Sequence, residues 1–307
     1  MKDIRDLVGI KYPIFQGAMA QISYYPLVAA VSEAGGLGII ASGGLTPDQL
    51  KYQIKEVKAR TNNPFGVNLM LMKDNTQHVE VLIEEGVKVV TTGAGTPKPY
   101  MKRLKEAGVV VIPVVPSAKL AIKMQELGAD AVVAEGTEAG GHVGEACSLP
   151  LWQAVIKAVD IPVVAAGGIA DGKGLAAAFA LGAKGVQMGT VFLATEECPV
   201  AKEFKEVVLK ADELSTVVTG RKAGGPVRSI ANAMTKVYLE LEEKNATRDE
   251  FEKIAGGSLR KAVLEGNTDE GSVMAGQIVC LVNEIKKVKE VIEDTMAEAK
   301  AVVIEIK

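Results

Sequence analysis

The stretch IPVVAAGGIADGKGLAAAFALGAKGVQMGT, residues 161–190, decides the fold class of this chain. Its two apolar runs, 161–166 and 185–188, are continuous rather than alternating, which is typical of strands covered on both faces. The alanine-rich segment 174–181 between them has the character of a helix. Gly182 follows this segment, at the position where glycine commonly ends a helix. The stretch therefore predicts a strand, a helix and a second strand parallel to the first.

The same order of helix, glycine and strand recurs along the first two thirds of the chain. Other glycines that end a helical stretch just before an apolar run are Gly35, Gly86, Gly108 and Gly128. The resulting strand candidates are 13–16, 37–42, 65–70, 87–92, 109–115, 130–135, 161–166 and 185–188. Helical segments such as 46–60 and 117–127 lie between them. Eight such units within about 190 residues favour a closed (β/α)8 TIM barrel over a doubly wound sheet, which usually has fewer strands.

After residue 195 the strand signal stops and the chain becomes helical and more polar. The helix candidates in this part are 201–211, 230–244, 248–255 and 282–300. We interpret them as a small helical subdomain or lid beside the barrel. The short alternating end, 301–307, fits a strand or a frayed tail equally well.

Composition and charge exclude several classes of function. The 307 residues are 48% hydrophobic and 24% charged, and 35 Lys and Arg against 38 Asp and Glu leave a net charge of −3. Because no basic field is present, we expect neither nucleic acid nor membrane as a partner. The charged start, 1–11, lacks the apolar segment of a signal peptide, so we expect a cytoplasmic protein. Cys147, Cys198 and Cys280 are widely spaced, and we expect no disulfide framework and no metal site.

Glycines follow directly after each of the last two predicted strands of the barrel. Gly167-Gly168 comes after the seventh strand and Gly189-Thr190 after the eighth. TIM barrels assemble their active sites at the carboxyl ends of the strands and often bind a phosphate at these two loops. Paired glycines also make ordinary tight turns. Glycine in both loops, with the hydroxyl of Thr190, favours a phosphate ligand.

The loop 135–144, EGTEAGGHVG, follows the sixth strand and carries one of the two histidines. His142 on such a loop could polarise a carbonyl or move a proton near neutral pH, although an exposed loop histidine can also be inert. Glu135 ends a buried strand and points to the same mouth, whereas Glu138 could simply be solvated. His78 lies on a predicted surface helix, where a structural role is the better interpretation.

Other features limit the possible ligands. Met19 and Met274 could line an apolar pocket, although methionine often serves only as filler. No GxGxxG fingerprint or phosphate-binding P-loop follows a strand at the required spacing. Any nicotinamide cofactor must therefore bind outside a Rossmann fold.

Several short motifs spread along the chain carry a family resemblance. They are 12–17 (YPIFQG), 64–68 (PFGVN), 89–95 (VVTTGAG), 111–116 (VIPVVP), 135–142 (EGTEAGGH), 165–172 (AAGGIADG), 189–190 (GT) and 271–277 (GSVMAGQ). Together they resemble the nitronate monooxygenase superfamily of FMN barrels, and within it the flavin-dependent enoyl-acyl-carrier-protein reductases of bacterial fatty-acid biosynthesis look most similar. The resemblance covers nearly the whole chain, in order.

The resemblance implies a barrel over 1–205, an inserted helical lid over 206–273, and a C-terminal segment, 274–307, that returns to the barrel. It also implies one FMN per chain. The residues expected to contact the flavin and its ribityl chain are Gly17, Ala18, Met19, Asn68, Glu135, Gly140 and Gln187. Those expected to hold the phosphate are Gly167, Gly168, Gly189 and Thr190. One departure concerns residues 145–148, EACS, which stand where many members have a hydroxyl-rich stretch.

By the same resemblance His142 would reach the substrate as the catalytic residue. The expected reaction is reduction of the 2,3 double bond of a trans-2-enoyl thioester on acyl carrier protein, with NADH or NADPH as the electron source. A homodimer is the expected assembly. The alternative in the same family is a nitronate monooxygenase, which oxidises alkyl nitronates with O2. A third hypothesis is a flavin-free phosphate-binding barrel, such as a sugar-phosphate isomerase or a ligand-binding regulator.

Overall fold

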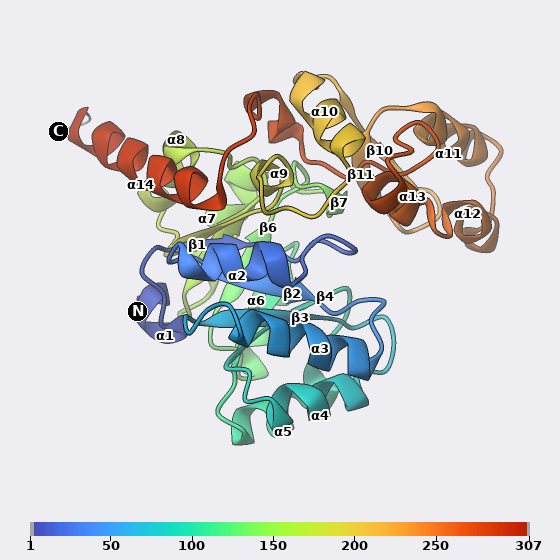
Figure 1. Ribbon diagram of the computed structural model, residues 1–307. Helices are drawn as coiled ribbons and strands as arrows, with labels where there is room; N and C mark the ends of the chain where they lie inside the picture. Colours follow the sequence, from blue (N-terminus) through green and yellow to red (C-terminus); the bar gives the residue numbers. More distant parts are fainter. Residues whose placement is uncertain (1–2, 306–307) are drawn as a thin grey trace.

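The computed structural model describes residues 3–305, and its central element is a closed barrel of parallel strands. The strands close in chain order, with the last one, β9, pairing with β1. This confirms the (β/α)8 barrel predicted from the sequence (Figure 1). The barrel strands are β1 (Ile14–Gln16), β2 (Leu37–Ala41), β3 (Phe65–Met70), β4 (Val89–Gly93), β5 (Val110–Val115), β6 (Val132–Glu135), β8 (Val163–Ala166) and β9 (Gly185–Met188).

Helices follow the strands and surround the barrel. Their local signals are strong: Thr46 and Gln49, for example, form a reciprocal capping box at the start of α3. The glycines expected to end helices, at 35, 86, 108, 128 and 182, all have positive φ angles. The helices of this part are α1 (Ile4–Val8), α2 (Tyr25–Glu33), α3 (Pro47–Lys58), α4 (Thr76–Glu84), α5 (Lys98–Glu106), α6 (Ala118–Glu126), α7 (Ser148–Ala158), α8 (Gly172–Ala180) and α9 (Thr190–Leu193).

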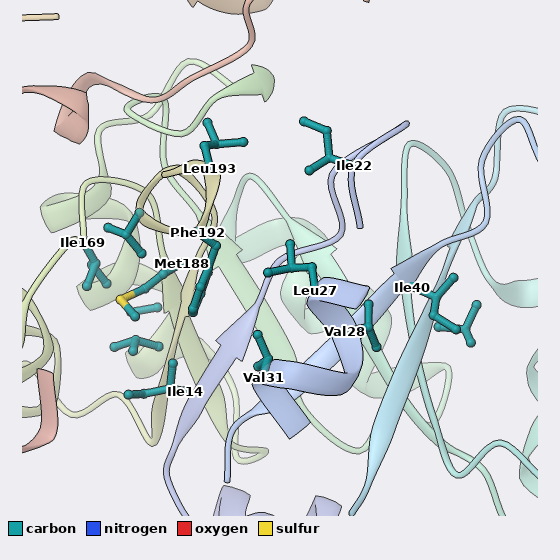
Figure 2. Close-up of a cluster of buried hydrophobic side chains, with 14 of the residues drawn as sticks. Ile14, Ile22, Leu27, Val28, Val31, Ile40, Ile169, Met188, Phe192 and Leu193 are labelled. Carbon is teal, nitrogen blue, oxygen red and sulfur yellow. The ribbon is translucent and has the colours of Figure 1, made fainter. Parts of the chain in front are cut away.

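Two layers of buried side chains explain the continuous apolar runs of the strands. Alternate residues point into the barrel, where Phe15 and Ile39 belong to an inner cluster. Their neighbours point outward to the helices, where Ile14 and Ile40 belong to a larger outer cluster. Figure 2 shows part of this outer cluster, in which side chains of α2, including Leu27, lie beside those of β1 and β2. Both faces of each strand are therefore buried.

The lid segment, 206–273, contains helices as predicted and also two strands where the sequence indicated helices only. Strands β10 (Thr216–Thr219) and β11 (Val227–Ile230) form a three-stranded antiparallel sheet with β7 (Gly141–His142). The strand signal was weak because three of the four residues of β10 are only half-buried. The helices in and before the lid segment are α10 (Lys202–Lys210), α11 (Ala233–Glu243), α12 (Arg248–Ala255) and α13 (Ser258–Glu265).

Two bounds expected from the sequence in this region do not coincide with the ends of the observed helices. Residue 206 falls inside α10, so the expected boundary cuts a helix. The helix predicted at 230–244 begins only at Ala233, because Ile230 completes β11 and the side chain of Asn232 caps the helix.

The C-terminal segment returns to the barrel, and its last helix lies on the side away from α11–α13 (Figure 1), whereas its first part contacts α10. The short 3-10 helix η1 (Gln277–Leu281) precedes α14 (Val288–Glu305), which packs against α8 and α2. Residues 301–305 continue α14 rather than forming a strand, and residues 306–307 of the alternating end lie outside the described residues. Among the helices within residues 3–305, none combines the length and the apolar character that crossing a membrane requires.

Candidate active site

The floor of the site is the uppermost ring of inward-facing side chains in the barrel. Glu135, Ala166 and Gln187 occupy matching positions on the neighbouring strands β6, β8 and β9. Asn68 and Thr91 occupy matching positions on β3 and β4. The ring is therefore polar on two sides, with the small side chain of Ala166 between Glu135 and Gln187. A cavity of about 690 Å³ lies above this floor.

A smaller pocket of about 90 Å³ adjoins the cavity and is lined mainly by glycines and their neighbours. The two spaces share several lining residues, among them Glu135, Gly140 and Gln187. Every site residue predicted from the sequence lines one of the two spaces or both. Those in the small pocket are Gly17, Ala18, Met19, Glu135, Gly140, Gly167, Gly168, Gln187, Gly189 and Thr190. Asn68 and His142 line the larger cavity.

Gly167 and Gly168 form a bare backbone cradle at the end of β8. Both have positive φ angles, of 94° and 72°, a region that side-chain-bearing residues rarely adopt. A Cβ atom at Gly167 would lie 2.7 Å from the Ser148 hydroxyl and 3.0 Å from the Gly136 carbonyl oxygen. Within residues 3–305, the N–H groups of Gly167 and Gly168 donate to no other residue. These amides are available to an anion.

The adjacent helix starts differ in what they can offer to an anion. The first turn of α8 is already occupied, because Asp171 accepts from the Gly174 N–H at 2.9 Å and Glu298 accepts from the Gly172 N–H at 2.8 Å. At the start of α9, Gly189 has no acceptor for its N–H among the described residues, and the hydroxyl of Thr190 accepts from the Gly276 N–H at 2.9 Å. The amides that face the small pocket therefore come from the loops after β8 and β9.

Glu135 is a half-buried carboxyl group at the end of β6. Burial raises the pKa of this carboxyl to about 7, and no neighbouring charge offsets the loss of hydration. Among the side chains that the structure describes, none contributes a hydrogen bond that would lower this pKa. Glu135 is therefore a group that can be neutral or charged near neutral pH, and it faces both spaces of the site.

The side chain of Glu138 binds within the protein, whereas from the sequence it could simply have been solvated. Its carboxylate accepts from the Ser148 N–H at 2.9 Å and from the Ser148 hydroxyl at 2.7 Å, so it stabilises the start of α7. Trp152, one turn further along α7, donates from its indole N–H to the Ala166 carbonyl at 3.1 Å. These contacts fix the ends of β6 and β8 relative to each other.

Asn68 is oriented by hydrogen bonds to its oxygen atoms. The Thr91 hydroxyl donates to the side-chain Oδ1 at 3.0 Å, and the Ser42 hydroxyl donates to the backbone carbonyl at 2.6 Å. With Oδ1 occupied, the side-chain amide N–H groups remain as the donors that Asn68 can present to the cavity.

His142 lies on β7, opposite Val227 of β11, and lines the larger cavity. His142 is exposed to solvent, but its backbone belongs to a sheet rather than to a flexible loop. Met19 and Met274 line the same cavity, as the sequence suggested. His78, in contrast, lies on α4 away from both spaces, and its imidazole is 2.9 Å from the Leu45 carbonyl oxygen.

Sequence reasoning named Met274 from the returning C-terminal segment but missed two other residues of this segment. Gly276 and Ile278 line the small pocket. A Cβ atom at Gly276 would lie 2.6 Å from the Glu138 carbonyl oxygen, so only glycine allows this close approach. The small residues at 275–276 are the only sequence signal for this contact. Pro226 at the edge of the lid sheet was also missed.

The fold and the site together define a TIM barrel with available backbone N–H groups after its last two strands and a cavity above a polar floor. The family model described as nitronate monooxygenase matches residues 2–78 and 74–298. The chain therefore belongs to the nitronate monooxygenase family, a family of flavin-dependent oxidoreductases.

Individual relatives carry different names. FabK from Thermotoga maritima is 49% identical, with a TM-score of 0.96 and coverage of 99% of this chain and 97% of that chain. The nitroalkane oxidase from Streptomyces ansochromogenes is 29% identical, with a TM-score of 0.90 and complete coverage of both chains. A (3aS,4S,5R,7aS)-5-hydroxy-7a-methyl-1-oxo-octahydro-1H-indene-4-carboxyl-CoA dehydrogenase from Rhodococcus jostii is 35% identical, covering 96% of this chain and 95% of that protein.

Proposed function

We propose that this oxidoreductase is an FMN- and NAD(P)H-dependent enoyl-acyl-carrier-protein reductase of fatty-acid biosynthesis. The observation that carries the proposal is the likeness to FabK, an enoyl-acyl-carrier-protein reductase, over nearly the whole length of both chains. The name of the Rhodococcus jostii relative adds that a member of this family acts on a thioester. Acyl carrier protein as the partner, and a homodimer as the assembly, belong to the same proposal.

The residues of the site fit FMN. A phosphate needs N–H donors without competing side chains, and Gly167, Gly168 and Gly189 offer such donors beside the Thr190 hydroxyl. The flat isoalloxazine of FMN needs an open surface with polar groups at its edge. The floor of the cavity, which includes Asn68, provides such a surface. We therefore assign the phosphate to the small pocket and the flavin ring to the cavity above the floor, next to Gly17, Ala18, Met19, Glu135, Gly140 and Gln187.

Bound FMN would supply hydride transfer between a nicotinamide and the carbon–carbon double bond. The chain itself orients the reactants and excludes water. Met70, Met72 and Met274 line the cavity, and their apolar side chains suit an acyl chain. When the double bond is reduced, negative charge develops on the thioester oxygen, and we assign to His142 the hydrogen bond that stabilises it.

The decisive experiment follows NAD(P)H oxidation after addition of a trans-2-enoyl thioester to the purified yellow protein. We expect fast oxidation that depends on the thioester, and an inert mixture would contradict the proposal. The control is the same protein with the saturated acyl thioester, which should give only background oxidation.

A nitronate monooxygenase is the second candidate. The family match and the Streptomyces ansochromogenes nitroalkane oxidase favour it, as does a probable nitronate monooxygenase from Staphylococcus saprophyticus that is 31% identical over 92% of this chain. In this reaction His142 would act as the base. Oxygen uptake with an alkyl nitronate in the absence of nicotinamide would support this candidate, and we expect it to be slow compared with enoyl reduction.

A further inference from the structure

Arg228 is a nearly buried cation at the junction between the lid sheet and the barrel. It lies on β11 and is only 7% exposed. Its Nε donates to the Thr137 carbonyl at 3.0 Å, and its Nη1 donates to the Thr216 hydroxyl at 2.9 Å. One side chain thus reaches the loop after β6 and the neighbouring lid strand β10 at once.

The backbone around Arg228 holds the same loop further along. Gly141 lies opposite Arg228, and His142 lies opposite Val227, in the antiparallel pairing of β7 with β11. The Val143 N–H donates to the Pro226 carbonyl at 3.1 Å. The segment 137–143 is therefore attached to β11 at both of its ends, with the guanidinium at one end and the strand pairing at the other.

The other side of this loop is attached to the barrel. The carboxylate of Glu138 accepts from the backbone and hydroxyl of Ser148 at the start of α7. Arg228 and Glu138 thus hold the loop from opposite sides, one through the lid and one through the barrel.

Burying a guanidinium against neutral oxygen acceptors is expensive, because these acceptors replace only part of its hydration. Burial lowers the pKa of Arg228, the carboxylate of Glu138 partly compensates, and the like charge of Arg221 lowers the pKa further. A smaller polar or apolar side chain would avoid this cost. Arginine, however, has donors at a fixed angle that can reach two separate acceptors.

We propose that Arg228 is a positioning residue that sets the location of His142 above the cavity by fixing the loop 137–143 to the lid sheet. The positional part of this inference stands on the contacts alone, and its catalytic consequence rests on the proposed function of His142. Arg228 itself does not line either space of the site.

The first test measures loop order without activity, by hydrogen exchange of the FMN-bound protein. In Arg228→Gln we expect the amides of residues 137–143 to exchange at least about tenfold faster, since one charged anchor is lost. The matched control is Lys236→Gln on α11, an exposed lid cation whose side chain has no hydrogen bond or ion pair with the residues that the structure describes; it should leave these amides unchanged. Unchanged exchange in Arg228→Gln would overturn the proposal.

A milder variant covers the case in which Arg228→Gln does not fold. Thr216→Val keeps the shape of the side chain but removes the acceptor for Nη1. We expect exchange of the same amides to accelerate about fivefold, as for one hydrogen bond. If these amides keep their wild-type exchange in Thr216→Val, the guanidinium does not need its lid anchor, and the proposal fails.

The second test is a double-mutant cycle on enoyl reduction with Arg228→Gln and His142→Ala. If Arg228 acts through His142, its substitution should lower kcat about tenfold in the wild-type background and hardly at all in His142→Ala, with FMN affinity unchanged. Fully additive losses would overturn the positioning role. A wild-type protein that does not reduce the thioester at all would refute the proposed function instead, and the exchange experiment would still decide the inference about Arg228.

Discussion

The barrel and the lid sheet contribute to the site in different ways. Barrel strands are buried on both faces, and the loops after β8 and β9 present backbone groups whose positions depend on glycine conformations and tight packing. The lid sheet is short and partly exposed, and it contributes His142 and Pro226 to the outer cavity. On the proposed function, we therefore expect cofactor binding to depend on the barrel and substrate handling to depend on the lid, so that the two can be impaired separately.

The largest difference should appear in local stability. We expect amides of the barrel strands to be protected from hydrogen exchange on the order of 10³-fold more than those of α11–α13, because the lid helices bury fewer side chains. The amides of β11 next to β7 should have intermediate protection, because the hydrogen bonds of Arg228 hold this strand. Mass spectrometry of exchanged peptides measures this, and equal protection throughout 206–273 and the barrel would remove the distinction.

The next largest effect should come from the phosphate cradle. Gly167→Ala should weaken FMN binding by at least about 10²-fold, because its Cβ would lie 2.7 Å from the Ser148 hydroxyl and would displace the cradle. Gly128→Ala is the matched control: its φ angle of 92° is nearly the same, but its Cβ would meet nothing within 4 Å. Titration with FMN should therefore separate the two variants. Equal affinities would show that the cradle does not hold the phosphate.

A third prediction concerns the floor of the barrel and pH. The pKa of Glu135 is about 7 in the fold and about 4.3 in an unfolded chain, so the folded FMN-free protein binds more protons between these values. Its free energy of unfolding should therefore fall as pH rises from about 4.3 to 7, by on the order of 2 kcal/mol. Glu135→Gln should lack this fall. Parallel urea titrations of both proteins at pH 5 and pH 8 check it, and identical pH dependence would contradict a buried carboxyl.

The smallest effect should occur where the returning segment contacts the barrel. Thr190→Val removes the acceptor for the Gly276 N–H and should cost about 1 kcal/mol of stability, since a buried donor loses its partner. Thr190→Ser keeps the hydroxyl and should cost less. Chemical unfolding of both variants measures the difference, and a Val variant as stable as the Ser variant would show that this hydrogen bond is not needed.

The same contrast between barrel and lid explains how much could be predicted from the sequence. Strands β3 and β9 were predicted with their observed bounds. Strand β9 is buried throughout and is followed by Gly189, and β3 is a largely apolar run that begins directly after Pro64. The site residues around Gly167 and Gly189 followed from the barrel, since its strand ends all meet at one mouth. Strand β10 was missed because three of its four residues are only half-buried. Strand β11 was missed because the buried polar residues Arg228 and Ser229 interrupt its apolar run, and the partner strand β7 is only two residues long.

The remaining misses depend on contacts between distant segments. The approach of Gly276 to Glu138 joins residues that are far apart in the chain, and no local pattern indicates it. The partner of Glu138 was missed for a similar reason: its carboxylate binds at the start of α7, ten residues away, where the sequence gives no capping residue of the usual type. Local patterns predict elements, whereas these contacts require the fold.

The most direct test of this account is stopped-flow absorbance of His142→Ala, with flavin reduction by NAD(P)H and reoxidation by the enoyl thioester followed separately. We expect FMN affinity and flavin reduction close to those of the wild type, because the barrel alone provides the cradle. Reoxidation by the enoyl thioester should slow by on the order of 10²-fold, as for one donor lost from a developing negative charge. Reoxidation at the wild-type rate, or loss of FMN together with activity, would contradict the assignment of cofactor binding to the barrel and of substrate handling to the lid.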